Sequence, residues 1–240
     1  MFKKHANRIS QQYEYYSKEY KKYEEKVYEL DKARVEKVYN IISSQLPGKI
    51  LEIGCLSGLF LIKLREIGWE CYGIELSKSI FKAKKSGLKV IQCDVEYGIP
   101  FRDNIFDIVY AGEIIEHIYD TDYFLEEIRR VLKPQGKLII TTPNIACLTN
   151  RILLLFGGYP RYLEYNKHGA GHIHLYNKDK LKKQLEKNKF IVIKMLGNFV
   201  SLPDPTPRKL IRNTIFKILG SYLPSLSENL IFIAIPSKSK

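Results

Sequence analysis

Residues 49–60 read KILEIGCLSGLF, and this stretch decides the fold. An apolar run over residues 50–53 follows the turn dipeptide Pro47-Gly48 and predicts a buried strand. A turn of small residues comes next, and leucines and isoleucines at helical spacing then predict a helix. A strand, a glycine turn and a helix in this order direct free backbone N–H groups and a positive helix end at a ligand. We therefore expect the binding site at this turn.

The length of the chain bounds its organisation. With 240 residues it is long enough for a single α/β domain over 1–240 with a full core. We expect N-terminal helices over 1–46 and cap insertions that build the acceptor site over 145–176 and 202–225. No apolar run approaches the roughly 18 residues that a membrane span needs, and the basic N-terminus lacks the apolar stretch of a secretory signal. A cytoplasmic location is the expectation.

The charge and the cysteines limit the classes of partner. A formal net charge of +13 invites nucleic acid or an anionic membrane surface. The lysines are spread along the chain without an arginine-rich block, which favours an ordinary solvated surface over nucleic acid. The four cysteines show no C-x-x-C pair, so neither a zinc site nor a disulfide framework is predicted. Nothing in the sequence indicates the oligomeric state.

Strands alternate with helices through the first part of the chain. Apolar runs predict strands over 49–53, 69–75, 88–93, 105–111 and 137–142, with a K-P-Q-G turn over 133–136. Helical patterns precede and separate them, including a tyrosine-rich one within 1–30, one over 30–46 and one over 79–86 that Ser77 could cap. This alternation indicates a parallel sheet covered on both faces, which binds ligands at the carboxyl ends of its strands.

The pattern changes after residue 145. A short apolar helix is predicted near 151–158, and a long aromatic, histidine-bearing segment over 157–176 has the length of a functional loop. Asn177 can then cap a helix over 178–187, and strands follow over 190–196 and 229–235. Between these strands lies an amphipathic helix over 208–222 with a basic face, which keeps peripheral membrane contact open.

Two ligand fingerprints compete for the glycine turn. A dinucleotide fingerprint, G-x-G-x-x-G, fails at Leu56 and Leu59 when it is aligned on Gly54. The pattern E-x-G-x-G-x-G starts at Glu52 and fails at Leu56 alone, so it is favoured. Glu75 follows the turn by about 20 residues, where doubly wound nucleotide folds place an acid on the ribose; a helix-dipole role is its alternative.

Five segments carry a family resemblance: LEIGCLSG, GIEL, QCDV, FDIVYAGEIIEHI and EIRRVLKPQGKLIITTPN. Together they resemble the class I S-adenosylmethionine-dependent methyltransferases, in the small-molecule branch that acts in ubiquinone and saccharide pathways. The resemblance implies a Rossmann-like seven-stranded sheet of order 3-2-1-4-5-7-6, with strand 7 antiparallel, helices on both faces and a small helical cap. It implies S-adenosylmethionine as the cofactor.

The resemblance also implies roles for individual residues. Glu52 would hold the amino group of the cofactor, Glu75 the ribose hydroxyls and Asp94 the adenine amino group, while the turn approaches the methionine part. The implied cofactor-binding set is Glu52, Gly54, Cys55, Leu56, Gly58, Glu75, Leu76, Asp94, Val95, Ala111 and Glu113. Leu56 departs from the pattern, and its side chain puts cofactor affinity in question.

Candidates for the chemistry are histidines and carboxylates. A hydroxyl nucleophile needs a base, for which His117, His172 and His174 are the catalytic candidates. The motif E-x-x-E-H at Glu113, Glu116 and His117 would share one helix face, and with His172 or His174 it resembles the metal site of small-RNA 2′-O-methyltransferases. The reading without a metal has Glu113 lining the cofactor site, with Glu116 and His117 pairing locally.

Three functions follow from these observations. We expect O-methylation of a small, lipid-linked or saccharide acceptor. A metal-dependent RNA 2′-O-methyltransferase is favoured by the charge and the E-x-x-E-H motif, and disfavoured by the lack of an appended RNA-binding domain. A non-catalytic binding module of the methyltransferase type is supported by Leu56 alone.

Overall fold

The protein is built on one sheet of seven strands in the order β3-β2-β1-β4-β5-β7-β6. The computed structural model describes residues 32–163, 171–202 and 214–237. Strands β1 to β5 pair in parallel, and β7 is antiparallel to both β5 and β6, which confirms the expected topology. The strands are β1 (Lys49–Ile53), β2 (Glu70–Glu75), β3 (Lys89–Gln92), β4 (Phe106–Gly112), β5 (Leu132–Pro143), β6 (Phe190–Gly197) and β7 (Asn229–Pro236).

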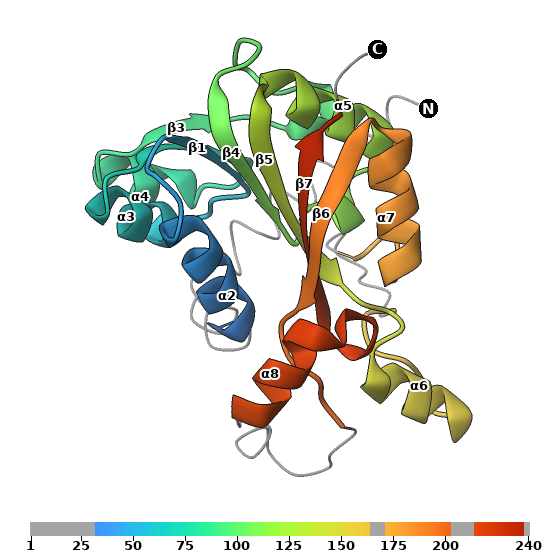
Figure 1. The fold of residues 1–240 in the computed structure, drawn as a ribbon. Coiled ribbons are helices and arrows are strands. Elements are labelled where there is room, and N and C mark those ends of the chain that lie inside the picture. Colours follow the sequence, from blue (N-terminus) through green and yellow to red (C-terminus); the bar gives the residue numbers. More distant parts are fainter. Residues whose placement is uncertain (1–31, 164–170, 203–213, 238–240) are drawn as a thin grey trace.

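Helices cover both faces of the sheet (Figure 1). One apolar cluster joins α2 (Lys32–Ser43), α3 (Leu59–Glu66) and α4 (Ile80–Lys85) to the sheet, and a second joins α5 (Thr121–Val131) and α7 (Lys178–Lys187) to the opposite face. Two further helices, α6 (Leu148–Leu155) and α8 (Thr214–Tyr222), follow the carboxyl ends of β5 and β6 and extend past that edge of the sheet. Single 3₁₀ turns complete the elements: η1 (Val95–Tyr97), η2 (Ile115–His117) and η4 (Pro224–Leu226).

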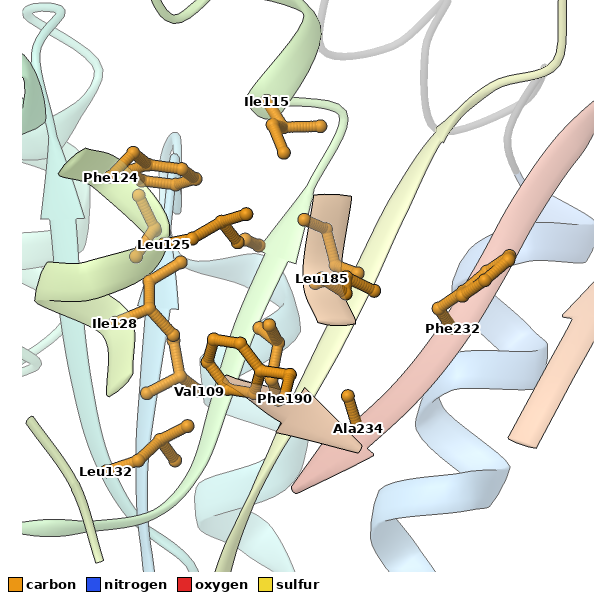
Figure 2. Close-up of a cluster of buried hydrophobic side chains, with 14 of the residues drawn as sticks. Val109, Ile115, Phe124, Leu125, Ile128, Leu132, Leu185, Phe190, Phe232 and Ala234 are labelled. Atoms are coloured by element: carbon orange, nitrogen blue, oxygen red, sulfur yellow. The ribbon is translucent and has the colours of Figure 1, made fainter. Parts of the chain in front are cut away.

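Helix α5 illustrates how the sequence pattern becomes packing. Phe124, Leu125 and Ile128 recur at helical spacing and are fully buried against the sheet, where Leu185 of α7 joins them (Figure 2). The Asp120 side chain accepts a hydrogen bond from the Tyr123 N–H at 3.0 Å and so caps the first turn. The apolar face and the cap together orient the segment that precedes α5, and that segment carries part of the site.

Three local expectations were wrong. The turn predicted over 133–136 is part of the long strand β5, because the β4–β5 register shift between Phe106 and Ile108 absorbs the extra residues. The segment 113–117 is not a regular helix: Glu113 has φ 56°, and one 3₁₀ turn follows it. Ser77 does not cap α4, which begins after Ser79; the two serine hydroxyls bond each other at 2.6 Å.

Several expectations lie outside the described residues. They include the tyrosine-rich helix within 1–30, part of the loop over 157–176 and the first part of the helix over 208–222. Among the described helices, none combines the length and the apolar character that crossing a bilayer requires.

Candidate active site

The carboxyl ends of β1, β2 and β4 meet at the glycine turn. Ile53 pairs with Ile74 on one side and with Ala111 on the other, and the Gly54 N–H donates to the Ile74 carbonyl at 2.8 Å. The turn needs left-handed backbone three times, at Gly54 (φ 77°), Leu56 (φ 49°) and Gly58 (φ 78°). Leucine takes a conformation that costs an L-residue about 1–2 kcal/mol, so this position of the turn favours glycine.

Leu56 and Ser77 hold the carboxylate of Glu75. The Leu56 N–H donates to one oxygen at 2.9 Å and the Ser77 N–H to the other at 2.7 Å. Burial raises the pKa of Glu75, while these hydrogen bonds act against that rise. The Leu56 backbone therefore orients the predicted ribose acid, and the Leu56 side chain is half-buried.

Two carboxylate oxygens near Glu75 are buried and lack a hydrogen-bond partner among the described residues. Glu52 Oε2 lies in β1, and Asp94 Oδ2 lies just after β3. The other Asp94 oxygen accepts from the Glu96 N–H at 3.0 Å and caps η1. Burial raises the pKa of Glu52 to about 8, against the opposing charge of Arg34. Acceptors of this kind fit a ligand that brings donors, as the ammonium and adenine amino groups of S-adenosylmethionine do.

The remaining predicted cofactor residues line the same strand ends. Cys55 is buried, and burial raises the pKa of its thiol, so the sulfur stays protonated. Val95 and Ala111 are buried in the core, whereas Leu76 is half-buried and its carbonyl accepts from the Gln92 side chain at 2.9 Å.

Arg34 is a buried residue of the site that the sequence reasoning missed. It extends from α2 and donates to the Tyr110 hydroxyl at 2.6 Å and the Thr141 hydroxyl at 3.2 Å. Its Nε lies 3.6 Å from Glu113 Oε1, and its charge also acts on Glu52. A signal was present, because a charged residue stands four positions before Val38 on the apolar face of the helix pattern.

Glu113 is turned toward Arg34. Its carboxylate accepts from the Thr141 hydroxyl at 2.9 Å and from the Asn229 side-chain amide at 2.8 Å. With its left-handed backbone, Glu113 does not join the cluster of Glu116, His117 and His172, although its charge still raises the pKa of Glu116. Asn229, at the start of β7, is a second site residue that motif spacing did not reveal.

The structure brings Glu116, His117 and His172 together, three of the four residues of the metal alternative. One potential ligand atom from each lies within 4.8 Å of the others, and the two imidazole rings are 5.0 Å apart. Glu116 is buried; one of its oxygens accepts from the Thr142 hydroxyl at 3.0 Å, and burial raises its pKa well above the usual range. Burial also lowers the pKa of His172.

Main-chain contacts dock the histidine segment on η2. The Glu116 carbonyl accepts from the N–H groups of Ile173 at 2.9 Å and His174 at 3.1 Å. The His174 ring lies apart from the three-residue cluster, with Nε2 3.3 Å from the Tyr119 carbonyl. Of the predicted catalytic histidines, the structure thus joins His117 and His172.

Comparisons with known proteins agree with the fold and with the family resemblance. Residues 51–140 match the family model described as a methyltransferase domain. A ubiquinone biosynthesis O-methyltransferase of Bradyrhizobium diazoefficiens is 28% identical over 158 residues, covering 62% of this chain and 60% of the relative. The human mitochondrial ubiquinone biosynthesis O-methyltransferase is 35% identical over 118 residues, covering 45% of this chain and 32% of the relative. The chain therefore spans less than two thirds of the length of these curated relatives.

Solved structures share the fold. A Thermotoga maritima protein described as an S-adenosylmethionine-dependent methyltransferase and possible histamine N-methyltransferase superposes with a TM-score of 0.66 at 18% identity, covering 93% of this chain and 98% of that one. The 1,6-didemethyltoxoflavin-N1-methyltransferase of Burkholderia thailandensis, solved with S-adenosylhomocysteine bound, gives 0.65 at 13% identity, covering 98% and 90%. Residues 51–140 thus belong to the methyltransferase-domain family, and the motifs, the strand order and the relatives together support a class I S-adenosylmethionine-dependent methyltransferase.

Proposed function

We propose that this chain transfers a methyl group from S-adenosylmethionine to an oxygen atom of a small or lipid-linked acceptor. The observation that carries the proposal is a pair of buried carboxylate oxygens, on Glu52 and Asp94, for which the described residues supply no hydrogen-bond partner; both residues stand at or near the carboxyl ends of their strands, as Glu75 does. When bound, S-adenosylmethionine supplies an electrophilic methyl group on a sulfonium. The chain would hold this donor in line with the acceptor, and such positioning supplies much of the acceleration, up to about 7–11 kcal/mol in favourable cases.

Each carboxylate has a role in this proposal. Glu52 would accept from the ammonium group, Asp94 from the adenine amino group, and Glu75 from the ribose hydroxyls. Charge-assisted hydrogen bonds of this kind are typically short and strong. His117 and His172 would receive the proton of the acceptor hydroxyl, a contribution of about 10²–10⁴ in rate for a well-placed base.

Exposed apolar side chains support a lipid-linked acceptor. They lie on and near α6 and α8, past the carboxyl edge of the sheet (Figure 1): Leu154, Leu155, Phe156, Tyr159, Ile218, Leu219, Tyr222 and Leu223. Apolar side chains beside a surface of positive net charge suit a membrane with anionic lipids. The names of the two relatives point to a ubiquinone-type acceptor, and such an acceptor would be lipid-linked. Co-sedimentation of the protein with anionic and neutral vesicles tests this membrane contact. If the same amount of protein sediments without vesicles, the support for a lipid-linked acceptor is lost.

A divalent metal is a further element of the proposal, supported by the cluster of Glu116, His117 and His172. One carboxylate and two imidazoles are ligands that divalent transition metals accept. A bound metal would polarise the acceptor hydroxyl and lower its pKa. Turnover that survives complete chelation by EDTA would leave the two histidines as bases without a metal.

Calorimetry with S-adenosylmethionine tests the proposal. Saturable binding is expected, and Glu75→Ala should weaken it by about 10- to 100-fold because a hydrogen-bonding charge is lost. Glu70→Ala is the matched control, since Glu70 starts the same strand, lies 40% exposed in its side chain and faces the opposite edge of the sheet. No saturable binding at millimolar cofactor would leave only the non-catalytic binding module. Methyl transfer to RNA but not to a ubiquinone-type phenol would favour the RNA 2′-O-methyltransferase.

A further inference from the structure

Glu228 is a buried carboxylate that ties separate segments of the cap together. It precedes β7 and is 3% exposed. Its oxygens accept from the Tyr162 hydroxyl at 2.6 Å, the Thr149 hydroxyl at 3.0 Å and the Ser201 hydroxyl, and Arg161 Nη1 lies 3.7 Å away. Thr149 belongs to α6, Arg161 and Tyr162 follow that helix, and Ser201 follows β6. The carboxylate therefore fixes the position of the chain beyond α6.

Tyr162 is the part of this cluster that reaches the site. Its backbone is left-handed, with φ 73°, a conformation that a tyrosine keeps only where its surroundings hold it. Burial and the negative charge of Glu228 raise the pKa of the phenol well above its usual value, so the hydroxyl remains a donor. The bond from this hydroxyl to a carboxylate is charge-assisted and short. Glu228 thus anchors the side chain of Tyr162.

The Tyr162 carbonyl faces the ring of His172. Its oxygen lies 3.3 Å from His172 Nδ1, and the two rings are 6.3 Å apart. A carbonyl oxygen accepts only, so a hydrogen bond here requires the proton on Nδ1. In a neutral imidazole the lone pair is then on Nε2, the nitrogen left for a proton or a metal. The same ring packs 5.0 Å from His117.

We infer that Glu228 and Tyr162 are positioning residues that hold His172 in the Nδ1–H tautomer, with its Nε2 lone pair available to the site. Glu228 holds the Tyr162 hydroxyl, the anchored tyrosine holds its own carbonyl in place, and the carbonyl selects the tautomer. Such outer partners typically affect activity or metal affinity by about 10- to 100-fold. The inference rests on the proposed function for its catalytic meaning, but the tautomer can be measured without any turnover.

The experiment is NMR of the full chain with ¹⁵N-labelled histidine, kept free of metal by EDTA and held above the histidine titration range. Long-range ¹H–¹⁵N spectra distinguish the Nδ1–H and Nε2–H tautomers, and His172→Gln identifies the signals of His172. Wild type should show the Nδ1–H form. Tyr162→Phe removes the anchoring hydroxyl and should shift His172 toward the Nε2–H form, with kcat about 10- to 100-fold lower and the affinity for S-adenosylmethionine unchanged.

Ser201→Ala is the matched control, because it removes another donor to the same carboxylate and leaves the Tyr162 hydroxyl bond in place. It should leave the tautomer unchanged. An Nε2–H form in wild type, an unchanged spectrum in Tyr162→Phe or an equal shift in Ser201→Ala would each overturn the inference. If Tyr162→Phe fails to fold, Glu228→Gln weakens the same anchor and should raise the Nε2–H fraction, and an unchanged fraction overturns the inference. If the wild type shows the Nδ1–H form but does not bind S-adenosylmethionine, the proposed function fails, while the inference that Glu228 and Tyr162 position His172 stands.

Discussion

Replacing Leu56 tests the reading of the glycine turn most directly. Its φ of 49° costs a leucine about 1–2 kcal/mol, which Leu56→Gly would relieve. Glycine also destabilises the fold by about 0.5–1 kcal/mol relative to alanine, because it has more conformational entropy to lose from the unfolded chain. Leu56→Ala removes the same side chain atoms beyond Cβ but keeps the strain. The free energy of unfolding of Leu56→Gly should therefore exceed that of Leu56→Ala by about 0.5–1 kcal/mol. For a chain of this size this corresponds to a Tm that is about 1–4 °C higher.

Thermal and urea unfolding of both variants measure this difference, and calorimetry with S-adenosylmethionine measures what the side chain does to the ligand. If the side chain crowds the cofactor, both variants should bind more tightly; if it points away, neither affinity should change. Gly58→Ala is a positive control, since a Cβ at φ 78° would lie 2.3 Å from Leu88 Cδ1 and should destabilise clearly. An Ala variant as stable as the Gly variant would refute a left-handed Leu56.

Three further outcomes are expected. The folded-state pKa of Glu52, about 8, lies above its unfolded value near 4.5, so its contribution to the stability of the ligand-free protein should be complete below about pH 4.5 and fall away as the pH rises to about 8. Glu52→Gln should flatten this decline in urea unfolding; a wild-type slope in that variant would contradict a buried, protonated Glu52. Arg34→Leu should cost roughly 3–5 kcal/mol by leaving buried carboxylates uncompensated, whereas Lys32→Leu at an exposed position of the same helix should cost little; equal losses in thermal unfolding would exclude the buried pair. Binding of Co²⁺, monitored by its visible absorption, should be abolished in His172→Ala and retained in His174→Ala. Equal Co²⁺ binding by the wild type and both variants would place any metal elsewhere.

The positions of the predicted cofactor carboxylates in the fold could be predicted from the sequence, because they depend on local elements. Glu52, Glu75 and Asp94 stand in or just after strands that apolar runs identify, and parallel strands bring their carboxyl ends to one edge. Backbone at a strand end needs no knowledge of distant side chains to be placed. The charge beside one of these carboxylates was harder to predict, since Arg34, which opposes the rise in the pKa of Glu52, lies in a helix earlier in the chain.

The prediction of catalytic and metal-binding residues depended on their spacing in the sequence, and this spacing was misleading where the backbone is irregular. The motif over 113–117 suggested one helix face, but the left-handed Glu113 separates its carboxylate from Glu116 and His117. The Asn229 amide and the Thr141 hydroxyl hold Glu113 in that direction. Neither partner is near in sequence, so no local pattern could have revealed the division.

Periodicity in the sequence determined the alternation of strands and helices and the position of the glycine turn, because it reflects local conformation, while the strand order came from the family resemblance and is confirmed by the structure. The roles of Glu52, Glu75 and Asp94 toward the cofactor stay predictions from short motifs. Tertiary structure alone decided which groups share the site: Arg34 with Glu113, His172 with His117, and Tyr162 with Glu228. These pairs join residues whose meeting depends on how helices and loops pack over the sheet edge. Packing of that kind is set by the whole core, and no single stretch of sequence records it.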